Sequence, residues 1–144
     1  MEKSCGFVAY KIIENKNYYL LIRGLNGDVG FPKGHVEGDE TEIETAKREL
    51  KEETNIEVKA IDGFRKEIEY KIPSKKNTLK QVVYFLGECV SDKIVCQLEE
   101  ITDAGFFTFD DAYKIITFDD SRKILLEAEE LINSKTRFEE QNYG

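Results

Sequence analysis

Hydrophobic positions in the first part of the chain occur in short runs of β-branched and aromatic residues, which favour strands. Residues 7–13 and 18–23 form two such runs, and the polar segment 14–17 between them is typical of a hairpin turn. Runs of the same kind predict further strands over 56–60, 64–72, 81–90 and 105–107.

Between these strands the pattern changes to that of an amphipathic helix. Apolar residues three and four positions apart give a helix over 40–54 one buried stripe, made of Ile43, Ala46 and Leu50. The pair Gly38-Asp39 is expected to cap the start of this helix. Asn55 is expected to end it in the left-handed conformation.

Two more helices are predicted near the carboxyl end. A short one covers 110–116, and a longer one covers about 119–134. The longer helix has an apolar stripe made of Ile124, Leu125, Ala128, Leu131 and Ile132. The polar tail from about Lys135 is expected to fray.

This order of elements predicts a mixed α/β sandwich, because strands stand on both sides of a central helix and a helix ends the chain. The 144 residues suit a single domain over 1–144 that buries a core without disulfides or metal staples. Neither a repeat nor a Pro/Gly/Ser-rich linker divides the sequence.

Charge and composition exclude several partners. A net charge of −8 argues against binding to a nucleic-acid duplex or to anionic lipid, so a polyanionic substrate needs a bound metal and a few placed lysines. No apolar run approaches the ~18 residues of a membrane span, and the first residues lack the features of a secretory signal. Three cysteines without a CxxC pair indicate reduced thiols in a cytoplasmic protein.

Three carboxylates lie on one side of the predicted central helix. At about 100° per residue, Glu49, Glu52 and Glu53 occupy one arc beside the apolar stripe. Like charges at this spacing repel, so the arrangement favours a compensating cation, and hard oxygen ligands suit Mg²⁺ or Mn²⁺. The alternative is a solvated acidic face in which neighbouring basic residues pair with the acids.

The spacing around these acids resembles the Nudix box. That pattern is Gly, five residues, Glu, seven residues, Arg-Glu, an aliphatic residue, any residue, Glu-Glu, any residue, Gly and an aliphatic residue. The matching positions are Gly34, Glu40, Arg48, Glu49, Leu50, Glu52, Glu53 and Ile56. The one departure is Asn55 in place of the second glycine, and asparagine is the best replacement where φ is positive.

The resemblance implies an α/β/α sandwich with a mixed sheet, in which the box forms a loop–helix–loop. Glu52 and Glu53 would ligate a divalent metal, and Glu49 would ligate metal or activate water. Arg48 and Glu40 would form a structural pair that holds the acids in place. The metal would activate the attacking water and neutralise charge on the phosphates.

Two further contacts to the metal are implied by the same resemblance. The backbone of Gly34 would lie close to it, and many family members add a carboxylate from a loop outside the box. Glu99 and Glu100 are the candidates, and Glu100 is favoured by its distance from the predicted strand at 105–107. An ordinary polar loop is the alternative.

The residues that precede the box restrict the range of expected substrates. The stretch 31–37, FPKGHVE, resembles that of the asymmetric diadenosine tetraphosphate hydrolases within the family. Lys33 suits a long polyphosphate, since an ammonium beside the metal cluster binds another phosphate. His35, the only histidine, would contact phosphate or pack the loop.

Later positions resemble the same subfamily, in which a tyrosine stacks on adenine and basic groups hold the phosphates. Tyr70 is the candidate stacking residue and Lys80 the candidate phosphate contact. Lys80 belongs to a basic stretch that also contains Lys71, Lys75 and Lys76. Strand packing for Tyr70 and solvated charges for the lysines are the alternatives. Phe118 would close the base pocket or pack in the core.

Three functions follow from these features. The leading one is a metal-dependent pyrophosphohydrolase that cleaves diadenosine tetraphosphate to ATP and AMP by water attack on phosphorus. The second is hydrolysis of another nucleoside or inositol polyphosphate, or of an RNA 5′ end. The third is a non-catalytic module that senses a nucleotide, against which the intact box glutamates argue. A small-molecule ligand is expected, and a monomer is favoured.

Overall fold

The computed structural model describes residues 2–72 and 78–143, with side chains described up to residue 138. Its strands are β1 (Glu2–Ile13), β2 (Lys16–Gly24), β3 (Val29–Gly30), β4 (Lys33–His35), β5 (Val58–Lys71), β6 (Leu79–Cys89) and β7 (Ile101–Thr108). Its helices are α1 (Glu42–Thr54), α2 (Phe109–Ile115) and α3 (Asp119–Tyr143). Among these helices, none has the length and apolar character needed to cross a membrane.

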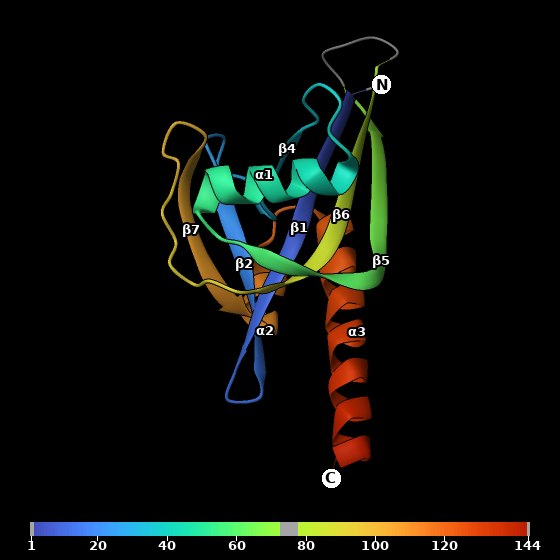
Figure 1. Ribbon diagram of the computed structural model, residues 1–144. Helices are drawn as coiled ribbons and strands as arrows, with labels where there is room; N and C mark the ends of the chain where they lie inside the picture. The colour runs from blue at the N-terminus through green and yellow to red at the C-terminus, as the bar shows by residue number, and fades with distance from the viewer. Residues whose placement is uncertain (1, 73–77, 144) are drawn as a thin grey trace.

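The strands form a mixed sheet in the order β3-β2-β1-β6-β5, with β4 added to β1 and β7 added to β2. Strands β1 and β6 run parallel, whereas the other pairs are antiparallel. Figure 1 shows α1 lying across one face of the sheet and α3 running along the opposite face. The predicted α/β sandwich with a mixed sheet is therefore confirmed.

The central strand β1 supplies both layers of the core, because successive side chains of a strand point to opposite faces. Phe7 and its alternate neighbours pack with Ala46 and Leu50 of α1. Val8 and Tyr10 pack with Leu125 and the rest of the apolar stripe of α3. The predicted stripes of α1 and α3 are thus the surfaces that these helices bury.

Several strands are longer than the sequence pattern indicates, because pairing extends them. The first hairpin turns at Glu14 and Asn15, both with positive φ, so that Ile13 pairs directly with Lys16. The two predicted strands at 56–60 and 64–72 are one strand, β5, with a register shift between Ala60 and Arg65. Such a bulge bends a strand without ending it.

The start of α1 corrects the predicted cap. Thr41 caps the helix, and its Oγ1 accepts a hydrogen bond from the Glu44 amide at 3.2 Å. The Glu44 carboxylate in return accepts from the Thr41 amide at 2.8 Å, which completes a capping box. The cap at Gly38-Asp39 was wrong, because this reciprocal pair satisfies two helix donors. Residue 40 therefore precedes the helix.

Two other helix ends were predicted, one correctly. Asn55 ends α1 with φ 67°, as expected for the left-handed position. The predicted end of the last helix near residue 134 is wrong, since α3 continues to Tyr143. A helix already nucleated by the buried stripe up to Ile132 adds further turns at little cost.

Candidate metal and substrate site

The box glutamates on α1 meet a carboxylate from the loop before β7. One carboxylate oxygen each of Glu49, Glu53 and Glu100 lie within 4.8 Å of one another. Glu49 and Glu53 are buried and Glu100 is exposed, so the group opens to solvent on one side. The structure brings Glu100 into this group, as expected, whereas Glu99 lies outside it.

The electrostatic properties of this carboxylate cluster favour the binding of a cation. Burial, and after it the charges of Glu49 and Glu100, raise the pKa of Glu53 to about 8 against the opposing effect of Lys33. Burial also raises the pKa of Glu49, and the guanidinium of Arg48 opposes that shift. Among the described side chains, Glu53 Oε2 is a buried oxygen without a hydrogen-bond partner. A divalent ion supplies the missing partner, so the residues fit one.

This raised pKa makes the stability of the metal-free protein depend on pH. The folded state holds a proton on Glu53 up to about pH 8, whereas the unfolded chain releases it near 4.5. The contribution of that proton to the free energy of unfolding is complete below about pH 4.5 and is lost as the pH rises through about 8. We expect the free energy of unfolding, measured in urea with a chelator, to fall from pH 5 to pH 8. In Glu53→Gln the part of this decline that comes from Glu53 should disappear. Parallel profiles of unfolding free energy against pH in the two proteins would contradict the raised pKa of Glu53.

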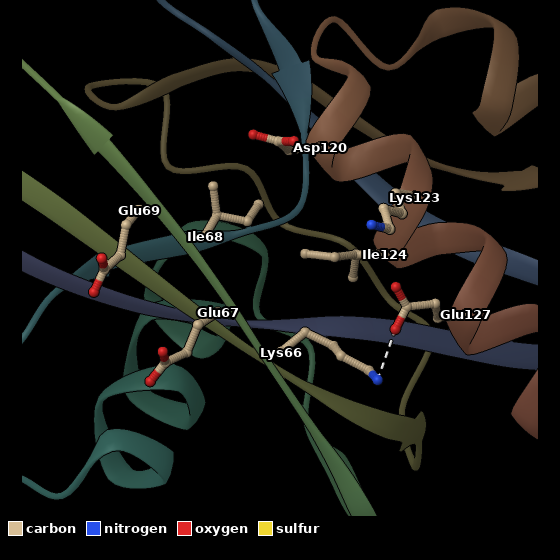
Figure 2. A pocket seen from close by; sticks show the side chains of 8 residues that line it. All are labelled: Lys66, Glu67, Ile68, Glu69, Asp120, Lys123, Ile124 and Glu127. Atoms are coloured by element: carbon tan, nitrogen blue, oxygen red, sulfur yellow. Dashed lines mark ion pairs between the residues drawn. The ribbon is translucent and has the colours of Figure 1, made fainter.

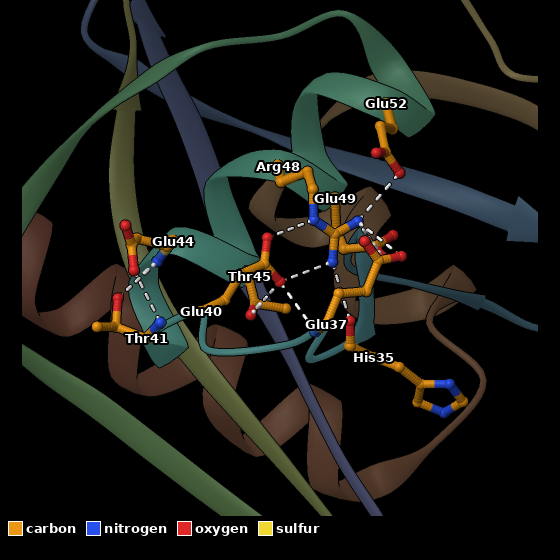
Figure 3. A network of polar contacts seen from close by, with 9 residues as sticks. All are labelled: His35, Glu37, Glu40, Thr41, Glu44, Thr45, Arg48, Glu49 and Glu52. Carbon is orange, nitrogen blue, oxygen red and sulfur yellow. Dashed lines mark hydrogen bonds and ion pairs between the residues drawn. The ribbon is translucent and has the colours of Figure 1, made fainter.

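Arg48 holds the start of the box together (Figure 3). Its Nε and Nη2 donate to the two carboxylate oxygens of Glu40 at 2.6 and 3.0 Å, and Nη2 also donates to the backbone oxygen of His35 at 3.0 Å. Its Nη1 donates to Glu49 at 2.9 Å and to Glu52 at 3.2 Å. Arg48 and Glu40 therefore make the contact that the sequence resemblance implied.

Glu40 can accept hydrogen bonds from Arg48 because it precedes α1 in the chain. Its Oε1 also accepts from the amide of Glu37 at 3.0 Å and from the hydroxyl of Thr45 at 2.9 Å. The hydrogen bond from Arg48, first among several causes, lowers the pKa of Glu40 to about 2. Glu40 thus stays ionised and fixes the guanidinium that in turn orients Glu49.

Gly34 lies directly against the carboxylate cluster. A Cβ built on Gly34 would stand 2.0 Å from Cδ of Glu49 and 2.2 Å from its Oε2. Only a residue without a side chain allows this approach, which places the backbone of β4 beside the carboxylates. The proximity of Gly34 to a metal stays a prediction.

Two candidate residues are not brought into the cluster. The carboxylate of Glu52 is half exposed and contacts Arg48, and it lies outside the group of three. The side chain of His35 is exposed and points away from the Arg48 network in Figure 3, while its backbone oxygen binds Arg48. Metal binding by Glu52 and phosphate contact by His35 stay predictions.

The candidate substrate residues lie on strands beside the cluster. Burial lowers the pKa of Lys33, the charge of Lys80 lowers it further, and the charges of Glu53 and Glu49 oppose the shift. Charges that act on Lys33 in this way are close to it, so Lys33 lies near Lys80 and near the carboxylates of Glu49 and Glu53. Tyr70, 44% exposed, stands opposite Lys80 in the β5–β6 register. Of the predicted basic stretch, Lys75 and Lys76 lie outside the described residues.

A crevice of about 290 Å³ opens between β5 and α3 (Figure 2). Lys66 and Ile68 line it from β5, on the same side of the strand as Tyr70, since alternate residues share a face. Lys66 forms an ion pair of 2.6 Å with Glu127 of α3. Phe118, just before α3, is 57% exposed, so its side chain is available at the surface and is not a core residue.

No sequence pattern indicates the backbone contacts that place Glu100. The amides of Val95 and Gln97 donate to the carbonyls of Thr54 and Glu53 at 2.9 and 3.0 Å. These bonds satisfy carbonyls at the end of α1, and they join residues about 40 positions apart. Such pairing depends on the path of the loop in space.

Comparisons with known proteins agree with this geometry. The sequence model of the NUDIX domain matches residues 6–128, a range that spans the carboxylate cluster, the Arg48 network and most of the sheet. The chain belongs to the Nudix family. This confirms the family and the fold class predicted from the box, and Nudix hydrolases as a class use divalent metal ions.

Two Nudix relatives in sequence are asymmetrical bis(5′-nucleosyl)-tetraphosphatases. The Sus scrofa protein is 30% identical over 92% of this chain and 96% of its own length. The Rattus norvegicus protein is 28% identical with the same coverage.

Two solved Nudix structures resemble the fold. A binary complex of C. elegans Ap4A hydrolase has a TM-score of 0.84 and 25% identity, covering 93% of this chain and 99% of the other. The NUDIX domain of Shewanella oneidensis NrtR, complexed with ADP ribose, has a TM-score of 0.69 and 16% identity, covering 90% and 87%. The second shows the fold alone.

Proposed function

We propose that this Nudix protein cleaves diadenosine tetraphosphate asymmetrically, to ATP and AMP. The observation that carries the proposal is the carboxylate cluster of Glu49, Glu53 and Glu100 beside Lys33. The relatives named for the same reaction, which match nearly their whole length, support the choice of substrate. The proposal includes Mg²⁺, with Mn²⁺ as a substitute, and a monomer of one domain acting in the cytoplasm.

The carboxylate cluster would hold the ion. Glu49 and Glu53 offer buried oxygens, and Glu100 completes the group from the solvent side. When bound, a divalent ion activates water and neutralises phosphate charge. Arg48 keeps the carboxylate of Glu49 in place, so little reorganisation is needed on binding.

The lysines and aromatic residues would bind the substrate. In a chain of net charge −8, Lys33 and Lys80 supply local positive charge where a tetraphosphate would pass the cluster. Tyr70 presents an exposed ring on the same face of the sheet as the crevice between β5 and α3. Its ring would stack on one base, with the crevice offering space nearby.

The substrate is tested by product analysis. The protein is incubated with diadenosine tetraphosphate, with and without Mg²⁺, and the nucleotides are separated by chromatography. ATP and AMP in equal amounts, formed only with metal, are expected. Two molecules of ADP would contradict asymmetric cleavage. If diadenosine tetraphosphate gives no products while a capped RNA or a diphosphoinositol phosphate is hydrolysed, the substrate belongs to the class of the compound that is hydrolysed.

The non-catalytic alternative gives a different result in the same assay. A nucleotide-sensing module binds diadenosine tetraphosphate without consuming it, so binding measured by calorimetry would occur with no product. The intact cluster of Glu49, Glu53 and Glu100 favours turnover.

Tyr70→Ala tests the stacking contact. Loss of a base–aromatic stack costs about 1–3 kcal/mol, so KM is expected to rise roughly 5- to 150-fold with little change in kcat. Tyr113→Ala is the matched control, because Tyr113 on α2 is also 44% exposed. Steady-state kinetics with diadenosine tetraphosphate measure both variants. An unchanged KM in Tyr70→Ala would assign that tyrosine to the strand surface alone.

A further inference from the structure

The loop that carries Glu100 is joined to the end of α1 by a row of hydrogen bonds. Residues 90–97 run antiparallel to residues 53–57. The bonds, in order, are Val90 N to Glu57 O (2.9 Å), Glu57 N to Ser91 Oγ (3.1 Å), Asn55 Nδ2 to Lys93 O (3.2 Å), Val95 N to Thr54 O (2.9 Å) and Gln97 N to Glu53 O (3.0 Å). We call this row the loop seam.

The loop seam ends next to the carboxylate cluster. The backbone oxygen of Gln97 accepts from the amides of Glu100 and Ile101, both at 3.0 Å. Gln97 therefore connects the backbone of Glu53 to that of Glu100 through one residue. Ile101 is buried and begins β7. The position of the Glu100 carboxylate thus depends on how firmly the loop seam is closed.

Hydrogen bonds hold this loop more than apolar burial does. Ile94 packs partly against the core, whereas Val95 and Leu98 are 53% and 69% exposed. A segment with few buried apolar contacts opens locally at low free-energy cost. Each bond of the seam therefore contributes to keeping Glu100 in reach of Glu49 and Glu53.

Asn55 is the residue of the seam at which this chain departs from the Nudix box. Its left-handed backbone, with φ 67°, lets its amide donate to the Lys51 carbonyl at 2.9 Å and close the helix. Glycine would do the same. The bond from Asn55 Nδ2 to the Lys93 carbonyl, however, requires a side-chain donor.

We propose that Asn55 is a positioning residue for the metal site: its side-chain amide fastens residues 90–97 to α1, so that Glu100 is held against Glu49 and Glu53 and a divalent cation binds more tightly. The proposal rests on the cation-binding role of this cluster given above. Asn55 acts through Glu100 and does not itself touch the ion or the substrate.

The test is direct Mn²⁺ binding to the whole protein, measured by calorimetry without substrate. Asn55→Gly keeps the left-handed backbone and removes only the side-chain bond. Since a hydrogen bond contributes about 0.5–1.5 kcal/mol, Mn²⁺ affinity is expected to fall about twofold to tenfold. Asn15→Gly is the matched control, because Asn15 has the same φ of 67° in the β1–β2 turn and its change should leave affinity unaltered.

A double-mutant cycle separates positioning from a general structural effect. In a Glu100→Gln background, Asn55→Gly should cause no further loss of Mn²⁺ affinity, because the group that it positions is gone. Hydrogen exchange at the amides of Val95 and Gln97 should be faster in Asn55→Gly. Unchanged Mn²⁺ affinity in Asn55→Gly, or an equal loss in the Glu100→Gln background, would overturn the proposal.

The outcome of these Mn²⁺-binding experiments does not depend on which substrate the protein hydrolyses. Mn²⁺ binding is read without diadenosine tetraphosphate, so the absence of its hydrolysis refutes the proposed function and leaves the cycle to decide the role of Asn55. If Glu100→Gln by itself leaves Mn²⁺ affinity unchanged, Asn55 has no ligand to position, and this proposal fails while the hydrolase assay still stands.

Discussion

Glu53→Gln is expected to lower kcat for diadenosine tetraphosphate at least about 100-fold at saturating Mg²⁺. Glu53 is the most buried carboxylate of the cluster, at 3% exposure, and its Oε2 is the oxygen that a cation would satisfy. A metal ion contributes several kcal/mol to the transition state, and each 1.4 kcal/mol corresponds to about tenfold in rate. Product formation over time at several Mg²⁺ concentrations measures the loss.

The fold should survive this change, because glutamine has nearly the same volume and introduces no buried charge. Circular dichroism and urea unfolding of Glu53→Gln check this point. Glu99→Gln makes the same chemical change next to Glu100 but outside the cluster, and it should keep kcat within about twofold. Activity retained in Glu53→Gln would show that this carboxylate is not a metal ligand.

Gly34→Ala should damage the same site from the backbone side. The added methyl group would stand 2.0 to 2.3 Å from the carboxylate atoms of Glu49, which Arg48 holds at 2.9 Å. The side chain of Glu49 must then leave its position. Mutations of the groups that orient a metal ligand typically cost 10- to 100-fold in affinity or activity, so we expect Mn²⁺ affinity to fall by at least about 10-fold.

The backbone at Gly34 does not require glycine, since its φ is outside the left-handed region. The effect of Gly34→Ala therefore reports on the contact with Glu49. Gly30→Ala in β3 is the control, because a Cβ there meets no atom within 4 Å. Calorimetric titration with Mn²⁺ compares the two variants. Equal affinities would mean that Glu49 moves aside without loss and that the close approach has no functional role.

Much of the fold was predictable because it depends on local periodicity. The apolar stripes of α1 and α3 and the strand runs follow from spacings of three to four residues or of two. The left-handed end of α1 at Asn55 followed from residue type alone. The sequence pattern misled where two signals compete, as at the start of α1, where the predicted cap at Gly38-Asp39 is wrong and Thr41 and Glu44 form the capping box.

The lengths of strands and helices were less predictable, because they depend on the segments of the chain with which these elements pair or pack. The sequence indicated a break near Gly63, but pairing with β6 carries β5 through it as a bulge. Strand β7 begins at Ile101 and not near Gly105, because it pairs along most of β2. Hydrogen bonds between distant segments extend elements beyond the residues that favour them.

The sequence by itself determined the box register, and its resemblance to the Nudix family implied the pairing of Arg48 with Glu40 and a position close to the metal for the backbone of Gly34. Those features depend on fixed spacing along one loop and one helix. The sequence favoured Glu100 over Glu99 as the extra carboxylate, but only the tertiary structure decided that Glu100 reaches Glu49 and Glu53 and that Asn55 binds the loop. These arrangements depend on hydrogen bonds between residues 53–57 and 90–97, whose meeting is set by the packing of the whole sheet.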